Sequence, residues 1–205
     1  ELESAKIAIK LVKEGKADIP MKGILQTSNF ARAILNRETG LIPASGRRLV
    51  SQCGIFEYEG RFIMITDAAI NINPDVETQI GIVENALPVA KALGNDCPKV
   101  AVLSAVENVT EKMASTVTAA EIAKRGVPGC IISGPLALDG AISMESVKHK
   151  AIHDPVAGQA DILLVPFIEI GNVLYKACTY IAGKTMASTI CGASCPVVIT
   201  SRADT

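Results

Sequence analysis

Apolar residues recur along this chain in two patterns, as short continuous runs and at helical spacing. Residues 4–14 carry apolar side chains at helical spacing and stop before Gly15, which predicts a helix. Continuous runs rich in Val, Ile and Leu predict buried strands. We expect strands over residues 17–23, 49–58, 61–66, 99–106, 129–133, 160–166, 185–191 and 196–200.

Helices are predicted between these runs, over residues 27–37, 73–94, 110–125, 143–150 and 171–182. Pro88 predicts a kink or break in the second of these, because proline lacks an N–H donor. Gly134-Pro135 predicts a turn, and Glu59-Gly60 predicts a hairpin between two strands. The alternation of strands and helices favours an α/β fold with a mostly parallel sheet, to which the hairpin adds antiparallel strands.

Composition narrows the class of partner. The chain has 205 residues, 49% hydrophobic and 20% charged, enough to bury a core in one large domain or two small ones. A net charge of −1 and an aromatic content of 3% argue against nucleic acid. No apolar run is long enough to span a bilayer, so we expect no membrane partner. Six cysteines without a Cys-x-x-Cys pair favour reduced core thiols and a cytoplasmic location.

Two motifs are set aside. Gly183-Lys184-Thr185 resembles the end of a phosphate-binding loop, but Cys178 stands where that loop needs a glycine and a helix precedes it. His149 and His153 are four residues apart, yet no acidic third ligand follows at useful spacing. We expect surface histidines and no metal site.

Polar residues follow several predicted strands. Lys22 ends the first strand, and Gln26 and Thr27 open the next helix, whose N–H groups and dipole form a natural anion site. Arg32 lies one turn further on and adds charge, and Asp67 ends the strand over 61–66. The segments 104–108 and 166–172, which include Asn172, follow two more strands. Each segment alone is ordinary turn chemistry, but together they predict a polar rim on one edge of the sheet for a phosphate-bearing ligand.

Near the end of the chain, Ser201 and Arg202 follow the point where an apolar run stops. The guanidinium group of an arginine at a strand end can bind phosphate through two N–H groups. The same arginine is equally well interpreted as an ordinary solvated side chain. This stretch alone does not separate the two interpretations.

Several separated motifs resemble the phosphate acetyl/butyryl transferase family, and its butyryl branch in particular. They are residues 22–27 (KGILQT), 65–71 (ITDAAIN), 134–139 (GPLALD), 156–166 (VAGQADILLVP), 171–176 (GNVLYK) and 200–204 (TSRAD). The resemblance covers essentially the whole chain in order. Relatives normally carry sequence before the segment matching Glu1 and a helix after the one matching Thr205, so we expect native sequence to be missing at one or both ends.

The resemblance implies a reversible reaction in which acyl-CoA and phosphate give acyl phosphate and CoA. It implies a two-domain, isocitrate dehydrogenase-like architecture, with residues 1–73 plus 189–205 in one domain and 74–188 in the other. It also implies a homodimer or larger assembly and no metal or prosthetic group. Short-chain, acetyl and carrier-linked long acyl substrates are all found in related enzymes, and a binding domain without activity is the alternative from another class.

Three of the site residues follow from the same resemblance. Ser201 and Arg202 match the pair that contacts the reacting groups, and Arg32 matches a phosphate-binding arginine. The other expected substrate-binding residues come from the polar segments at strand ends described above, and they are Lys22, Gln26, Thr27, Asp67 and Asn172. The base carboxylate of acetyl-transferring relatives lies beyond Thr205, and Asp204 is not at the matching spacing, so the base is unassigned.

Overall fold

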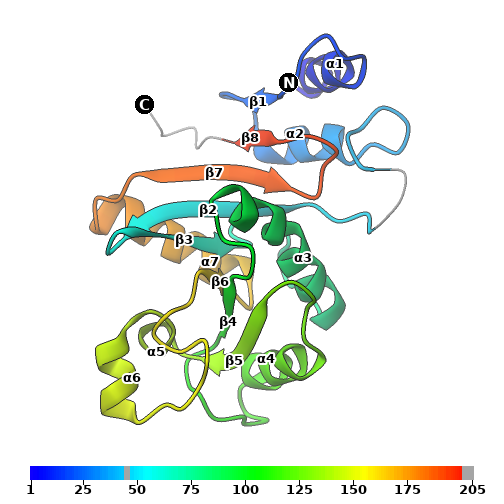
Figure 1. Cartoon of the computed structure of the whole chain (residues 1–205). Helices are drawn as coiled ribbons and strands as arrows, with labels where there is room; N and C mark the ends of the chain where they lie inside the picture. Colours follow the sequence, from blue (N-terminus) through cyan, green and yellow to red (C-terminus); the bar gives the residue numbers. More distant parts are fainter. Residues whose placement is uncertain (44–46, 200–205) are drawn as a thin grey trace.

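The computed structural model of the chain describes residues 1–43 and 47–199. Within these ranges, eight strands form one mixed sheet in the order β1-β8-β7-β2-β3-β6-β4-β5, with helices against it (Figure 1). The strands are β1 Met21–Lys22, β2 Ser51–Tyr58, β3 Arg61–Thr66, β4 Lys99–Leu103, β5 Ile131–Leu136, β6 Ile162–Leu164, β7 Met186–Cys191 and β8 Val197–Ile199. The predicted α/β class is confirmed.

Seven α-helices and one π-helix connect the strands in the described ranges. They are α1 Leu2–Lys13, α2 Thr27–Ile34, α3 Val76–Ala92, α4 Ala114–Arg125, α5 Leu138–Ile142, α6 Met144–Lys150, α7 Ile168–Lys176 and the π-helix η1 Ala177–Ile181. Asp75 caps α3 by accepting a hydrogen bond from the Thr78 N–H at 2.8 Å. None of these helices is long and apolar enough to cross a membrane.

Strand direction divides the sheet. β3, β6, β4 and β5 are mutually parallel, and β1 is parallel to β8. The pairs β8–β7, β7–β2 and β2–β3 are antiparallel, so β1 and β8 run opposite to β3, β6 and β4. The expected polar rim is nevertheless confirmed in part, because the segments that follow β1, β3 and β6 meet in one pocket, described below, whereas residues 104–108 do not line it.

The predicted hairpin between β2 and β3 is confirmed. Tyr58 pairs with Arg61, and Glu59 and Gly60 between them have φ values of 50° and 77°. Two consecutive residues with positive φ are typical of the two-residue turns that match the twist of antiparallel strands. This hairpin places β3 beside β6 and so joins the antiparallel part of the sheet to the parallel part.

The turn expected at Gly134-Pro135 and the break expected at Pro88 are both wrong. β5 continues through Gly134 and Pro135, and its pairing with β4 shifts register there; a side chain at Gly134 would meet the Val102 carbonyl at 2.8 Å. α3 is unbroken at Pro88, where proline removes only one hydrogen bond of the helix interior. The short helix α5 was not predicted, and β1 is shorter than expected.

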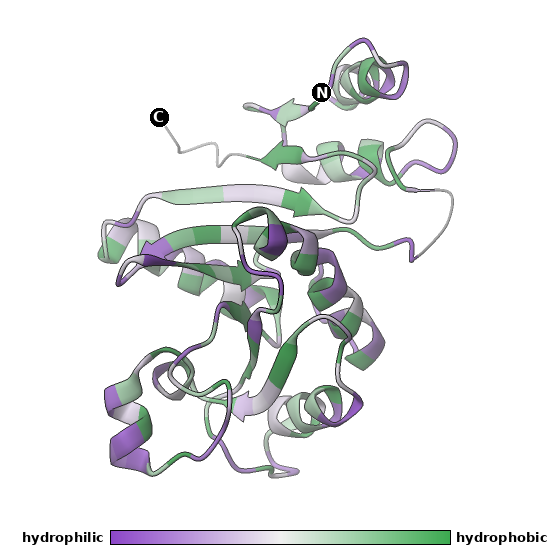
Figure 2. Ribbon diagram, viewed as in Figure 1, coloured by the Kyte–Doolittle hydropathy of each residue, from purple (hydrophilic) through white to green (hydrophobic). Residues whose placement is uncertain are grey.

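Both faces of the sheet are buried. Met64 faces the cluster formed with α3 and α4, while Ile63 and Ile65 face the opposite cluster with α5, α6 and α7. This alternation is the period of a strand, and burial on both sides explains why the strands read as continuous apolar runs. A third cluster packs α1 and α2 against β7 and β8, and Figure 2 shows the apolar residues of these strands in green.

Candidate active site

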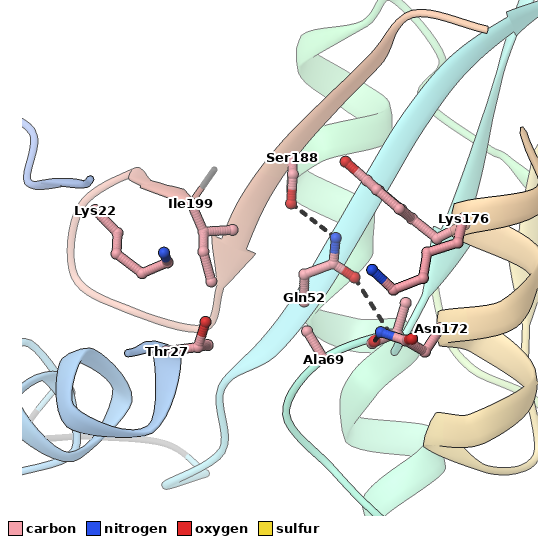
Figure 3. A pocket seen from close by; sticks show the side chains of 10 residues that line it. Lys22, Thr27, Gln52, Ala69, Asn172, Lys176, Ser188 and Ile199 are labelled. Carbon is pink, nitrogen blue, oxygen red and sulfur yellow. Dashed lines mark hydrogen bonds between the residues drawn. The ribbon is translucent and has the colours of Figure 1, made fainter. Parts of the chain in front are cut away.

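A polar pocket of about 310 Å³ lies beside the ends of β1 and β8, over β2 and β7 and against α7 (Figure 3). Lys22 and Thr27 lie on one side, Lys176 and Asn172 on the other, and Gln52 and Ser188 between them. The remaining lining residues are Ala68, Ala69, Tyr175 and Ile199. The pocket thus draws on both ends of the chain.

Lys22 supplies a buried positive charge. Its side chain is 1% exposed, and its Nζ donates hydrogen bonds to the carbonyl oxygens of Gly23 at 2.9 Å and Leu25 at 3.2 Å. Thr27, the first residue of α2, lies next to it in the lining. A helix N-terminus carries a partial positive charge. With Lys176 across the pocket, this end of α2 and Lys22 make the site favourable for an anion.

The floor of the pocket is held by Gln52, which is 3% exposed. Its Oε1 accepts a hydrogen bond from the Ala68 N–H at 3.2 Å, and its Nε2 donates to the Ser188 hydroxyl at 2.7 Å. Because the Ala68 N–H fixes which end of the amide is the oxygen, Ser188 Oγ must accept the bond from Nε2. The hydroxyl hydrogen of Ser188 is then directed elsewhere, and Ser188 lines the pocket.

Helix α7 forms the opposite wall at close range. A side chain at Gly171 would lie 2.7 Å from the Asp67 carbonyl oxygen and 2.9 Å from the Ala68 Cα. Tyr175 rests on β2 at Gly54, where a Cβ would meet the tyrosine ring at 2.6 Å. Asn172 donates a hydrogen bond from Nδ2 to the Ala68 carbonyl at 3.3 Å. Two glycines therefore set the position of the wall that carries Asn172 and Lys176.

Asp67 holds the loop that follows β3. Oδ1 accepts hydrogen bonds from the N–H groups of Ala69 and Ile70, at 2.9 and 3.1 Å, and Oδ2 accepts from the Asn71 N–H at 3.0 Å and its Nδ2 at 2.6 Å. The side chain is 2% exposed. Burial raises the pKa of Asp67, although these hydrogen bonds pull it down. The geometry gives Asp67 a loop-ordering role beneath the pocket.

The structure brings together three of the predicted substrate-binding residues, Lys22, Thr27 and Asn172, in the pocket lining. Asp67 is outside the lining, and Gln26 and Arg32 are exposed and also outside it. Ser201, Arg202 and Asp204 lie outside the described residues. Ile199, the last residue of β8, lines the pocket.

Sequence reasoning missed four lining residues with polar groups, Gln52, Tyr175, Lys176 and Ser188, and three apolar ones, Ala68, Ala69 and Ile199. Gln52 and Ser188 are polar residues inside strands, and only the pairing of β2 with β7 brings them within hydrogen-bond distance. A buried polar residue within an apolar run was the available signal. No group of three His, Cys, Asp or Glu side chains in the described ranges is arranged to hold a metal ion.

Comparisons with known proteins identify the family of the chain. A family model described as "Phosphate acetyl/butaryl transferase" matches residues 2–205. The probable phosphate butyryltransferase of Bacillus subtilis is 48% identical over 206 residues, which span 98% of this chain and 69% of that protein. The phosphate butyryltransferase of Clostridium beijerinckii is 46% identical over 203 residues, 96% of this chain and 66% of that protein.

A crystal structure of a branched-chain phosphotransacylase from Enterococcus faecalis superposes with a TM-score of 0.90 at 42% identity. The match covers 98% of this chain and 73% of that one. The chain spans about two thirds of the length of the two curated relatives, 69% and 66%. The chain belongs to the phosphate acetyl/butyryl transferase family, as its motifs indicated.

Proposed function

We propose that this protein is an acyltransferase that reversibly converts a short-chain acyl-CoA and phosphate into acyl phosphate and CoA, with butyryl-CoA favoured. The observation that carries the proposal is the pocket in which Lys22, Lys176 and the start of α2 surround a space suited to an anion. The named activities of the B. subtilis and C. beijerinckii relatives support the butyryl group. Acetyl-CoA is the alternative substrate, and a binding domain without activity is the alternative from another class.

The pocket suits direct transfer. Phosphate attacks the thioester carbonyl, and a tetrahedral oxyanion forms before the CoA thiolate leaves. Both phosphate and this oxyanion are negative, so fixed positive charges and hydrogen-bond donors stabilise the transition state more than they stabilise a neutral thioester. If both substrates bind together, no enzyme nucleophile is needed, and positioning supplies much of the acceleration.

Roles can be assigned to individual residues under this proposal. Arg202 stabilises phosphate and the oxyanion, and Ser201 donates to the reacting groups. Arg32 contributes to phosphate binding from outside the pocket lining. Lys22, Thr27 and Asn172 form the substrate-binding walls, and Lys176 adds charge. Gln26 caps α2 through its backbone, and Asp67 orders the loop that carries Ala68 and Ala69.

The larger organisation is also part of the proposal. We assign residues 1–73 plus 189–205 to one α/β domain and 74–188 to a second, with the isocitrate dehydrogenase-like architecture that the family resemblance implies. The cluster that packs α1 and α2 against β7 and β8 draws only on the first set, whereas β2 and β3 of that set pack in the two clusters with α3 to α7 of the second. We further propose a cytoplasmic homodimer or larger homo-oligomer that binds CoA and phosphate as substrates and holds no prosthetic group.

A thiol-release assay tests the function. Butyryl-CoA is mixed with the complete protein with and without phosphate, and free CoA is measured. We expect release that depends on phosphate and is faster with butyryl-CoA than with acetyl-CoA. CoA binding without release would favour the inactive binding domain, and faster release from acetyl-CoA would favour the acetyl alternative.

Arg202→Ala tests the leading residue. Removal of one charge-assisted contact in such a site costs on the order of 100-fold in rate. Arg202→Lys should recover only part of the loss, because an ammonium lacks the two-pronged geometry of guanidinium. The measurement is kcat for phosphate-dependent CoA release, and turnover near that of the parent in Arg202→Ala would remove Arg202 from the mechanism.

A further inference from the structure

A second cavity, of about 470 Å³, adjoins the polar pocket. Thr27, Ala68, Ala69 and Asn172 line both cavities, and the second extends to Ile168, Glu169 and Val173 on the first turns of α7. The shared residues make the loop after β3 and the side chain of Asn172 the boundary between the two. A molecule that occupies the polar pocket therefore has this second space as its immediate neighbour.

The two cavities differ in chemistry. Lysine, glutamine and serine side chains line the polar pocket, whereas four of the seven residues that line the second are apolar, Ala68, Ala69, Ile168 and Val173. Its charged lining residue is Glu169, an exposed carboxylate at the start of α7. A carboxylate repels phosphate groups, so this space disfavours inorganic phosphate and the phosphorylated end of CoA. An uncharged, apolar group fits it best.

We propose that this second cavity holds the acyl chain of the thioester substrate and that Ala69 sets the chain length accepted there. The inference rests on the proposed function, because it takes the polar pocket as the place where phosphate meets the thioester carbonyl. The acyl chain starts at that carbonyl carbon. Because the chain is short, it can contact only the part of the protein surface next to the carbonyl. Burial of their methylene groups against apolar side chains is favourable.

Ala69 is the residue at which a larger side chain should have the clearest effect on the length of the acyl chain that is accepted. It lines both cavities with a single methyl group. Its backbone is held in place, because its N–H donates to Asp67 Oδ1 at 2.9 Å. A larger side chain at this position narrows the passage from the carbonyl into the second cavity, and it leaves the positive groups of the polar pocket unchanged. Acetyl, which has one methyl group beyond the carbonyl, needs little of that passage.

Ala69→Val tests the proposal through a ratio of substrates. One methylene in an apolar pocket changes kcat/KM about 10- to 200-fold. We expect the kcat/KM ratio of butyryl-CoA to acetyl-CoA to fall at least about tenfold. Ala187→Val is the matched control, since Ala187 is exposed on β7 and lies outside both linings. Its ratio should not change.

Val173→Ala is the second variant, because Val173 is 67% exposed and its truncation leaves the core intact. It widens the cavity from the α7 side, so the rate with a five-carbon acyl-CoA should rise relative to butyryl-CoA. If neither variant changes its ratio of acyl-CoA substrates, the second cavity is not the acyl subsite. An equal rise of KM for every acyl-CoA would also overturn the proposal, because it would mean that the cavity holds the CoA arm. Absence of phosphate-dependent release by the parent protein would instead overturn the proposed function, and this inference with it.

Discussion

At the scale of the residue, the pocket depends on a few polar side chains whose hydrogen bonds define their direction. Gln52 links the loop after β3 to β7. Because Ser188 Oγ accepts the hydrogen bond from Gln52 Nε2, the Ser188 hydroxyl is left to donate its own hydrogen elsewhere. None of this could be predicted from the sequence, because Gln52 and Ser188 are distant in the chain and have no local motif. Lys22, Thr27 and Asn172 were predictable, since they follow strands or open helices.

Ser188→Ala removes the donor and leaves the Gln52 amide without its acceptor. A neutral hydrogen bond contributes about 0.5–1.5 kcal/mol, so we expect kcat/KM for the transfer to fall up to roughly tenfold. Ser4→Ala, at an exposed position of α1, is the control and should behave as the parent does. Parental kcat/KM in Ser188→Ala would mean that the hydroxyl does not face a substrate.

The cysteines are expected to have no role in the transfer. Cys53 is fully buried, and its hydrogen bond with Cys191 together with burial raises the pKa of its thiol well above the usual value. Only the thiolate reacts with alkylating reagents, so a raised pKa keeps Cys53 protonated and unreactive as the pH increases toward 9. Cys97 is exposed.

Iodoacetamide followed by mass spectrometry tests this expectation. Cys97 should be modified first without loss of transfer activity, and Cys53 only after unfolding. Rapid modification of Cys53 in the folded protein, with parallel loss of CoA release, would contradict a purely structural thiol.

At the scale of the element, most strands and helices followed from apolar periodicity, and the failures have particular causes. β5 passes through Gly134-Pro135 because the register shift against β4 absorbs them, and such a shift depends on the partner strand. The antiparallel arrangement of β8, β7 and β2 also could not be predicted from the local sequence pattern, since nothing in a short apolar run specifies which strand it will pair with. That arrangement, in turn, decides which polar residues meet.

Gly171→Ala tests the packing of α7 against the loop after β3. In an unobstructed helix, replacement of glycine by alanine stabilises by about 0.5–1 kcal/mol. Here the added methyl would lie 2.7 Å from the Asp67 carbonyl oxygen, so we expect destabilisation of about 1–3 kcal/mol and weaker substrate binding. Urea unfolding measures the change, and a gain in the free energy of unfolding would show that the contact is not as tight as described.

At the scale of the whole molecule, one pocket is built from segments far apart in the chain. Residues 21–27, 168–176 and 186–199 all contribute to it. A ligand that bridges its walls should therefore order all three segments at once. Hydrogen exchange with phosphate and CoA present should slow in these segments together and stay unchanged in α6, residues 144–150. Protection of a single segment would contradict a shared site.

The pairing of β1 with β8 also constrains the order in which the chain can fold. Lys22 is opposite Ile199 in the sheet, and Gln52 is opposite Ile190, so the pocket closes only through contacts between distant parts of the chain. Such contacts carry a high loop-closure entropy and form late. During synthesis, β4, β5 and β6 can pair as soon as residue 164 has left the ribosome, and β2 can pair with β3 even earlier. In contrast, β1 must wait for β8, and the second edge of β2 must wait for β7. The nascent chain should therefore acquire much of its core before it can bind any substrate.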